Sequence, residues 1–535
     1  MMASMEIESR RSAPGVRAAG AVLSATLLCG APAVASDTIL QPAEVVMSEG
    51  QLVPNIGTVV PGGVGPAVIN SSGFWVVEVT TDNVNPNSDR VLVKPGGIVA
   101  REGTPLAQPP GAILDDFLEF VLADDGSMAF RHVLGPGDWG VYLDDELIVR
   151  SGDDFQDASL APATYDVVAP LHLNEAGQLL ARAEVTQFAG AGSAFVVYEL
   201  TAPGVLSETV VVYSGQVLPA EMEVVGVVTG GRYSADLAAD GRVLFTVGTS
   251  SVGRVVYLAD GAFLTDVSPP GGLGIAPRVG LADDGGQIIR TSSTIYLDGE
   301  VVTQVDDPEF FEEAGDGTFH TVEFPQVADG GRTTWLAQWI SSTGPGEGLF
   351  VDGQLLVQSG VTRVDGHLVT SLSVPGLLNP LLHNLDVSSD GRWLLFGAQL
   401  EGLGESVVRV FLGPWTSLGE GLNGDELAVP KLTGVGPLTA GSDNALELRH
   451  AAPSSALLLV TGLSETPQPF FGGTLVPSPD FLRFGTTDAA GAFSFPFFLP
   501  GAAVGLSFVS QVWVRDPGGP AGLAASNAVR GVTQP

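Results

Sequence analysis

The side chains in this sequence that could do chemistry are mostly carboxylates placed in turns. One group stands apart, with six acids inside eleven residues followed by a glycine. Calcium takes six to eight oxygen ligands on a flexible loop, so this is the candidate calcium site, although its spacing is not that of an EF-hand. A solvated acidic loop is the alternative reading. The six residues are Asp306, Asp307, Glu309, Glu312, Glu313 and Asp316.

Paired aspartates form a second set, and each pair could in principle supply a general acid and a general base. The pairs recur at equivalent points of a repeated phrase. This favours solvent-exposed turn residues whose side chains hydrogen-bond to their own backbone. The pairs are Asp124 with Asp125, Asp144 with Asp145, Asp153 with Asp154, and Asp283 with Asp284.

Motifs of known catalytic and cofactor-binding sites are missing from the sequence. The six histidines occur singly, without metal-ligand spacing, and neither a nucleophile elbow nor a P-loop is present. The one cysteine, Cys29, lies in the N-terminal segment. We therefore predict no catalytic residue, no bound cofactor and, apart from the calcium candidate, no metal ligand.

Charge and hydropathy narrow the possible partners. The 535 residues carry 23 Lys and Arg against 60 Asp and Glu, a net charge of -37, which would repel a phosphate backbone. No uninterrupted apolar stretch reaches the roughly 18–20 residues of a membrane-spanning helix. We expect no nucleic-acid partner and no transmembrane segment, and we expect a monomer whose ligand is an extracellular protein or glycan.

The first 35 residues have the pattern of an export signal. Arg10, Arg11 and Arg17 precede an apolar run over 18–28, and an Ala-Val-Ala site ends at Ala35. We predict cleavage after Ala35. The mature protein is then expected to be secreted, periplasmic or held at the cell surface.

A short phrase recurs seven times, with a small or amide residue, two polar residues, a glycine and then an alternating apolar run. The glycines are 44 to 64 residues apart, and the fourth residue after each is apolar, as a half-buried strand requires. A second phrase with an acidic turn follows each one, and Asp-Gly turns indicate hairpins. The repeat glycines are Gly73, Gly126, Gly177, Gly241, Gly285, Gly331 and Gly391.

Two hairpins in each repeat give four strands, which is one blade of a β-propeller. The sequence therefore predicts an all-β, seven-bladed propeller over residues 36–415. The last repeat lacks its fourth strand, and a matching segment, Val45 to Gly50, precedes the first repeat. We expect this N-terminal strand to complete the last blade and close the ring, which removes exposed strand edges.

The phrase from Val387 to Phe396 resembles the strand-turn-strand unit of TolB-type propellers. The whole set, above all Asn174 to Arg182, is similar to secreted bacterial proteins with tandem Asn-x-x-Gly…Ala-Arg repeats. The resemblance implies a propeller fold and export, and it implies no activity. Most copies here replace the asparagine by alanine.

The C-terminal residues do not repeat the phrase. We predict a Gly-rich polar linker over 416–431 and an antiparallel β-sandwich over 432–535, since about six short alternating runs separated by turns occur there. The ending, from Gln511 to Gly531, resembles a terminal module of secreted planctomycete- and myxobacterium-like proteins. That resemblance implies a role in sorting, surface retention or stability.

The function predicted is non-enzymatic binding or scaffolding at or outside the cell surface. The alternative is a glycan hydrolase or lyase that uses carboxylates around the central channel. The channel itself should discriminate between them. Three or more acidic, His, Arg or Tyr side chains in one pocket would favour the enzyme, and a lining of small and apolar residues would favour binding.

Overall fold

The computed structural model describes residues 38–39 and 43–533 with internal gaps. The predicted signal segment and the candidate calcium loop lie outside the described residues. No helix among the described residues is long and apolar enough to cross a membrane. The gaps are 84, 86–87, 136–137, 157–161, 188–189, 203–204, 219–223, 229–232, 250–252, 262, 270–272, 274–276, 306–317, 342–343, 373–384, 420, 425–428, 437, 490 and 500–505.

The described chain is almost entirely β, as predicted, with only two 3₁₀ turns, η3 (Asp329–Gly331) and η4 (Pro520–Gly522). Its N-terminal part forms antiparallel sheets of four or more strands, each built largely from consecutive strands. The first three are β3 (Leu52–Val53), β4 (Gly57–Ile69), β5 (Trp75–Thr81), β6 (Arg90–Lys94) and β7 (Gly97–Arg101); β8 (Asp116–Leu122), β9 (Met128–Gly135), β10 (Asp138–Leu143) and β11 (Glu146–Arg150); and β12 (Ala163–Leu173), β13 (Gln178–Gln187), β14 (Gly190–Ala202) and β15 (Val205–Tyr213).

The next three sheets continue the series in chain order. They are β16 (Val225–Val227), β17 (Ala235–Leu237), β18 (Val243–Thr249), β19 (Arg254–Asp260) and β20 (Phe263–Asp266); β21 (Arg278–Leu281), β22 (Gln287–Arg290), β23 (Thr294–Leu297) and β24 (Glu300–Gln304); and β25 (Thr318–Ala328), β26 (Arg332–Ser341), β27 (Gly344–Val351) and β28 (Gln354–Gln358).

The repeat glycines lie where the sequence places them, in the turn between the first and second main strand of each sheet. All seven have a positive φ, from 68° at Gly391 to 102° at Gly285, a conformation that glycine adopts without steric cost. The recurring phrase is therefore the inner hairpin turn of a repeated unit.

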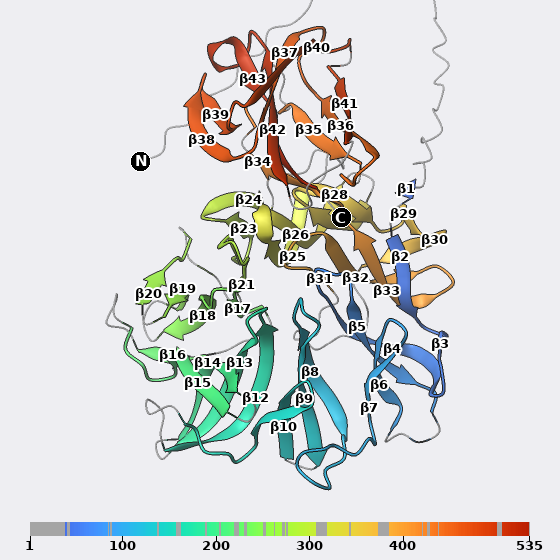
Figure 1. The fold of residues 1–535 in the computed structure, drawn as a ribbon, viewed down its shortest axis with the longest axis vertical. Coiled ribbons are helices and arrows are strands. Elements are labelled where there is room, and N and C mark those ends of the chain that lie inside the picture. The colour runs from blue at the N-terminus through green and yellow to red at the C-terminus, as the bar shows by residue number, and fades with distance from the viewer. Residues whose placement is uncertain are drawn as a thin grey trace, which may run out of the picture. The chain divides into compact units, whose positions relative to one another are not determined.

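The innermost strands of these sheets contact one another in a closed cycle. β4 contacts β8, and the contacts continue through β12, β17, β21 and β25 to β31 (Leu385–Val387), which contacts β4 again. Figure 1 shows the sheets following one another around a common centre. Successive four-stranded antiparallel sheets arranged around a centre are the architecture of a β-propeller.

The last of these sheets contains strands from both ends of this region. β31 pairs with β32 (Trp393–Leu400), and β32 with β33 (Gly404–Phe411). β33 then pairs with β2 (Ala43–Ser48) in an antiparallel register that joins Ala43 to Val410. The N-terminal strand thus supplies the outer strand that the last repeat lacks, as predicted. The same sheet also contains β1 (Thr38–Ile39), β29 (Thr362–Val364) and β30 (His367–Ser371).

The C-terminal residues form separate antiparallel sheets that share one apolar cluster. Leu446 and Phe495 from one sheet pack in it with Leu459 and Val512 from another. The sheets are β34 (Trp415–Gly419), β44 (Ala528–Val532), β42 (Ser507–Arg515), β37 (Ala456–Gly462), β40 (Phe481–Thr486) and β43 (Leu523–Ala525); β35 (Lys431–Val435), β36 (Ser442–Arg449) and β41 (Phe493–Leu499); and β38 (Glu465–Phe470) with β39 (Gly473–Pro477).

The linker predicted over 416–431 begins too early. β34 (Trp415–Gly419) is a strand that pairs with β44, and Leu422 bridges to Ala525. The side chain of Trp415 also belongs to the C-terminal apolar cluster. The alternation of this strand is hidden in the sequence by its glycine and serine residues, which are typical of loops.

The pairing of β34 with β44 predicts the result of limited proteolysis. A single cut between Leu422 and Lys431 should leave β34 on one fragment paired with β44 on the other. We expect two bands on a denaturing gel and one peak in native size-exclusion chromatography. Two separate native peaks would show that β34 contributes little to the C-terminal sheet.

Candidate functional site

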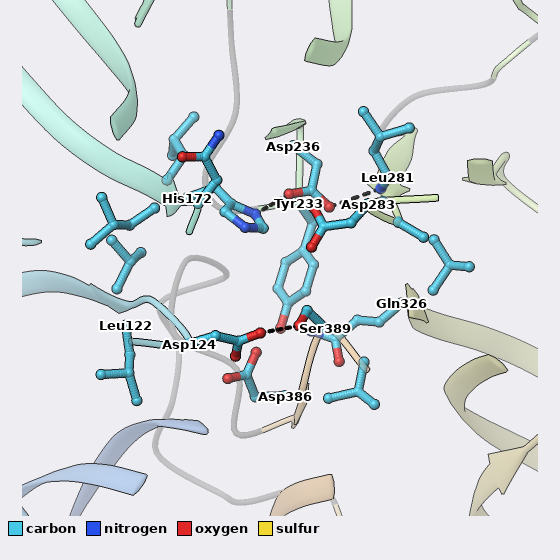
Figure 2. Close-up of a pocket in the computed structure, with 18 of the residues that line it drawn as sticks. Leu122, Asp124, His172, Tyr233, Asp236, Leu281, Asp283, Gln326, Asp386 and Ser389 are labelled. Atoms are coloured by element: carbon cyan, nitrogen blue, oxygen red, sulfur yellow. Dashed lines mark hydrogen bonds and ion pairs between the residues drawn. The ribbon is translucent and has the colours of Figure 1, made fainter. Parts of the chain in front are cut away.

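A pocket of about 120 Å³ lies at the centre of the propeller. Its lining comes from every strand of the inner cycle and from several of the turns that follow them, and Figure 2 shows the labelled side chains converging on one space. Residues far apart in the sequence meet here because each inner strand ends at the same side of the channel. The titratable lining residues are Asp124, His172, Glu175, Tyr233, Asp236, Asp283 and Asp386.

Four of the lining residues, Asp124, Glu175, Asp283 and Ser389, occupy one position of the repeat. The residue two before each repeat glycine stands in the inner hairpin turn, and four of these seven residues are acidic. We call this set the turn ring. Its members, in chain order, are Ser71, Asp124, Glu175, Ala239, Asp283, Asp329 and Ser389.

Carboxylates of the turn ring bind the backbone of the neighbouring sheet. Asp124 Oδ1 accepts the backbone N–H of Ser71 at 2.7 Å, and Asp283 Oδ1 accepts that of Ala239 at 2.5 Å. In both bonds, the acceptor residue and the donor residue each stand two residues before the repeat glycine, in adjacent sheets. Asp124 also accepts the hydroxyl of Ser389, a contact drawn in Figure 2.

For two of the four aspartate pairs, these bonds correct half of the prediction. Asp125 and Asp284, the second members, do hold their own turns, by accepting the N–H of Ser127 and Gly286. The first members, Asp124 and Asp283, instead join two sheets and line the pocket. Adjacent residues in a tight turn point in different directions, which the pattern of residue types does not reveal.

Two further aspartates reach the pocket from the strands, five residues before a repeat glycine. Asp236 on β17 accepts the N–H of Leu281 on β21 at 2.8 Å and also contacts His172 Nδ1. Asp386 on β31 accepts the N–H of Ile69 on β4 at 2.8 Å, in a buried bond. Both carboxylates therefore connect one inner strand to the next.

The side chain of Tyr233 crosses the centre of the channel. Tyr233 precedes β17, and its hydroxyl donates to the carbonyl of Leu385 on β31 at 3.2 Å. These strands are not neighbours in the cycle, so the ring must span the central space. Arg278 stacks on Tyr233 and on Phe324, with its guanidinium 4.0 Å from the centre of the Phe324 ring. This group narrows the channel beside the pocket.

Burial, and to a smaller extent mutual repulsion, raises the pKa values of acids in the turn ring. Burial raises the pKa of Asp329 to about 6, and the charges of Asp283 and Asp284 add to the effect. Burial and the nearby Asp124 carboxyl raise the pKa of Glu175, and burial raises that of Asp283. Accumulated negative charge of this kind favours the binding of a proton or of another cation.

The turn ring should therefore make stability depend on pH. The folded protein holds the Asp329 proton up to about pH 6, whereas an unfolded aspartate releases it near pH 4. This contribution to stability is complete below about pH 4 and is lost as the pH rises through 6. We expect Asp329→Asn, which keeps an acceptor without the charge, to raise the melting temperature at pH 8 and to change it little at pH 4.

The matched control for this test is Asp125→Asn, since Asp125 is exposed and its carboxylate accepts a hydrogen bond from its own turn. Asp125→Asn should change the melting temperature only slightly, and by the same amount at pH 4 and at pH 8. Equal effects of Asp329→Asn at pH 4 and pH 8 would contradict the prediction.

The structure brings some sequence candidates together and leaves others apart. His172 lies in the pocket, while His132 is buried among Phe117, Phe130 and Tyr142, where burial lowers its pKa to about 3. The calcium candidates from Asp306 to Asp316 lie outside the described residues. Within the described ranges, no group of three or more His, Cys, Asp or Glu side chains could hold a metal ion.

Sequence reasoning missed the pocket residues on the strands. His172, Asp236, Gln326 and Asp386 all stand five residues before a repeat glycine, in segments that are otherwise apolar. A polar residue at a fixed position of an apolar repeat strand was the available signal.

Comparison with known proteins gives no identification. No family model and no curated protein matches the chain. Among solved structures, the Dos1 propeller is 9% identical, with a TM-score of 0.33 over 68% of this chain and 82% of its own. The WD40 domain of SCAP from fission yeast is also 9% identical, with a TM-score of 0.28 over 92% of this chain and 91% of its own. AofleA from Arthrobotrys oligospora is 12% identical, with a TM-score of 0.26 over 58% and 90%. Similarity this remote carries no functional argument.

Proposed function

We propose that this chain is an exported, non-enzymatic binding or scaffolding protein that acts at or outside the cell surface. In this proposal a seven-bladed propeller, closed by β2, carries the binding site, and a C-terminal β-sandwich follows it. The cycle of inner strands and the pairing of β2 with β33 support the blade number. The apolar cluster shared by two C-terminal sheets supports the sandwich.

The hydrogen bonding of the pocket carboxylates is the observation that carries the proposal. The pocket has seven titratable lining residues. The sequence analysis took three or more as favouring an enzyme, so their number alone favours the enzyme. However, Asp124, Asp236, Asp283 and Asp386 each accept a backbone N–H from a neighbouring sheet. A carboxylate oxygen that accepts such a bond is held in place and already occupied, which suits binding better than proton transfer.

The chemistry of the pocket favours a small cationic group, such as the end of a lysine side chain or a free amine. Its lining includes five carboxylates and, among the described residues, neither Lys nor Arg. The Tyr233 ring, which lines the pocket, already stacks with the cationic Arg278. The volume of about 120 Å³ suits a short alkylammonium group and excludes a folded domain.

Titration calorimetry with butylammonium and with neutral butanol tests this proposal. We expect the amine to bind, the alcohol not to bind, and Glu175→Gln to weaken amine binding at least fivefold. The Asp125→Asn protein serves as the control, because its side chain holds its own turn outside the pocket lining. Equal affinity for amine and alcohol, or equal binding by Glu175→Gln, would rule out this site.

An enzyme remains the second candidate because of one contact. The His172 imidazole contacts Asp236, whose other oxygen is held by the Leu281 N–H, so a carboxylate orients a histidine that faces the pocket. That arrangement can serve a general base. A panel of glycan substrates should show turnover that His172→Ala abolishes if this reading is correct.

A further inference from the structure

An edge strand of the C-terminal region exposes large apolar side chains. Among the described residues, β40 is the last strand in its sheet and pairs with β37 on one side, in a regular register from Ala456–Thr486 to Thr461–Phe481. Phe481 is 62% exposed, Leu482 56% and Phe484 78%. Phe and Leu side chains are usually buried, so three exposures of this size on one short strand need an explanation.

The free edge of β40 has few of the features that prevent strand pairing. Such edges are commonly protected by a lysine, a proline, a bulge or a covering segment. β40 contains no lysine or proline, and its pairing with β37 shows no bulge. Arg483 is its one charged residue, and the guanidinium lies over the ring of Phe495 on β41, 5.5 Å from its centre.

We propose that β40 is the contact surface of a homodimer, in which β40 of one chain pairs antiparallel with β40 of a second copy. Antiparallel pairing of identical strands is two-fold symmetric, so the same surface serves both partners. The two sheets would then join into one continuous sheet across the dimer. This inference does not depend on the proposed ligand, and it departs from the monomer expected from the sequence.

The exposed area approaches what a dimer of this kind needs. With about 200 Å² for a whole phenylalanine and somewhat less for leucine, the three exposed side chains present roughly 400 Å² per chain. Complete burial of these side chains on both copies would give at most roughly 800 Å² of apolar surface, and the backbone edges add to it. Specific interfaces begin at about 1,000 Å² in total.

Charge favours a second copy at this particular surface. The chain carries a net charge of -37, so two copies repel at most points of contact, whereas β40 itself has one positive and no negative side chain. A register with Leu482 opposite Leu482 of the second copy places Arg483 opposite the exposed Phe481 ring. The alternative register, centred on Arg483, would place two positive charges opposite each other, which destabilises a strand pair.

Sedimentation velocity of the full chain tests the proposal. We expect dimers at micromolar concentrations, and a larger dimer fraction in 0.5 M salt than in 0.05 M salt, because salt screens the repulsion between copies. Phe484→Asp should shift the protein to monomers. Phe263→Asp is the matched control, since Phe263 is 79% exposed on β20 in the propeller, and it should leave the dimer intact.

A cross-link tests the register. Residues directly opposite in an antiparallel pair have Cα atoms about 4.5–5.5 Å apart, within the range of a disulfide. In a chain with Cys29→Ser, Leu482→Cys should form a covalent dimer on oxidation, and Phe484→Cys should form much less. Melting curves show whether each variant is folded.

The outcomes divide clearly. If the wild-type chain stays monomeric at 200 μM at both salt concentrations, the homodimer proposal is wrong. β40 would then be a contact surface for a different protein. A dimer that survives Phe484→Asp, and that forms no cross-link in the Leu482→Cys variant, is held together by another surface and equally overturns the proposal.

Discussion

Deletion of residues 36–52 should abolish stable folding of the propeller or lower its melting temperature by more than 10 °C. The deletion removes β2, and with it the strand that pairs with β33. Val46 and Met47 are buried in an apolar cluster with Leu395 and Val407. Without β2, β33 becomes an exposed edge and this cluster is opened to water, so both hydrogen bonds and apolar burial are lost.

A point substitution gives a milder form of the same test. Met47→Ala should lower the free energy of unfolding by about 2–5 kcal/mol, the usual cost of truncating a buried large side chain. Leu52→Ala, four residues after β2 at a side chain that is largely exposed, is the control and should cost less than about 0.5 kcal/mol. Urea unfolding followed by tryptophan fluorescence measures both values. Similar midpoints for the two variants would mean that β2 does not hold the ring closed.

Substitution of Asp386 by alanine should have the second largest effect. Its carboxylate accepts the N–H of Ile69 in a buried bond between β31 and β4, the two inner strands where the cycle closes. Alanine leaves that N–H buried without its acceptor, which costs about 1–3 kcal/mol. We expect a corresponding loss in the free energy of unfolding.

Asp386→Asn separates the loss of the acceptor from the loss of the charge. The asparagine oxygen can still accept the Ile69 N–H, so this variant should retain more of the stability than the alanine variant does. If alanine and asparagine destabilise the protein equally, the charge matters and the bond does not. If neither destabilises it, the contact between β31 and β4 is maintained by packing alone.

The propeller could be predicted because its information is local and repeated. Every repeat glycine marks a turn with positive φ, and the alternation after it marks the next strand, so each hairpin is specified within a few residues. The partner of the N-terminal strand could also be inferred, since the last repeat was one strand short and Val45 to Gly50 matched the missing piece. Alternation predicted about six strands in the C-terminal region, whereas its described residues form eleven, β34 to β44. β34 was among those missed, because its residues resemble a loop.

The candidate site depended on relations between repeats, which a single sequence does not display. Asp124 and Asp125 are adjacent and chemically identical, yet one bonds across to the next sheet and lines the pocket while the other holds its own turn. Tyr233 reaches Leu385, 152 residues away, because both lie at the centre of the same cycle. The sequence by itself determined the repeated hairpins and the closing strand, since turn chemistry and period-two alternation act over a few residues. Only the tertiary structure decided which carboxylates meet, since that depends on the rotation of one sheet relative to the next around the common centre.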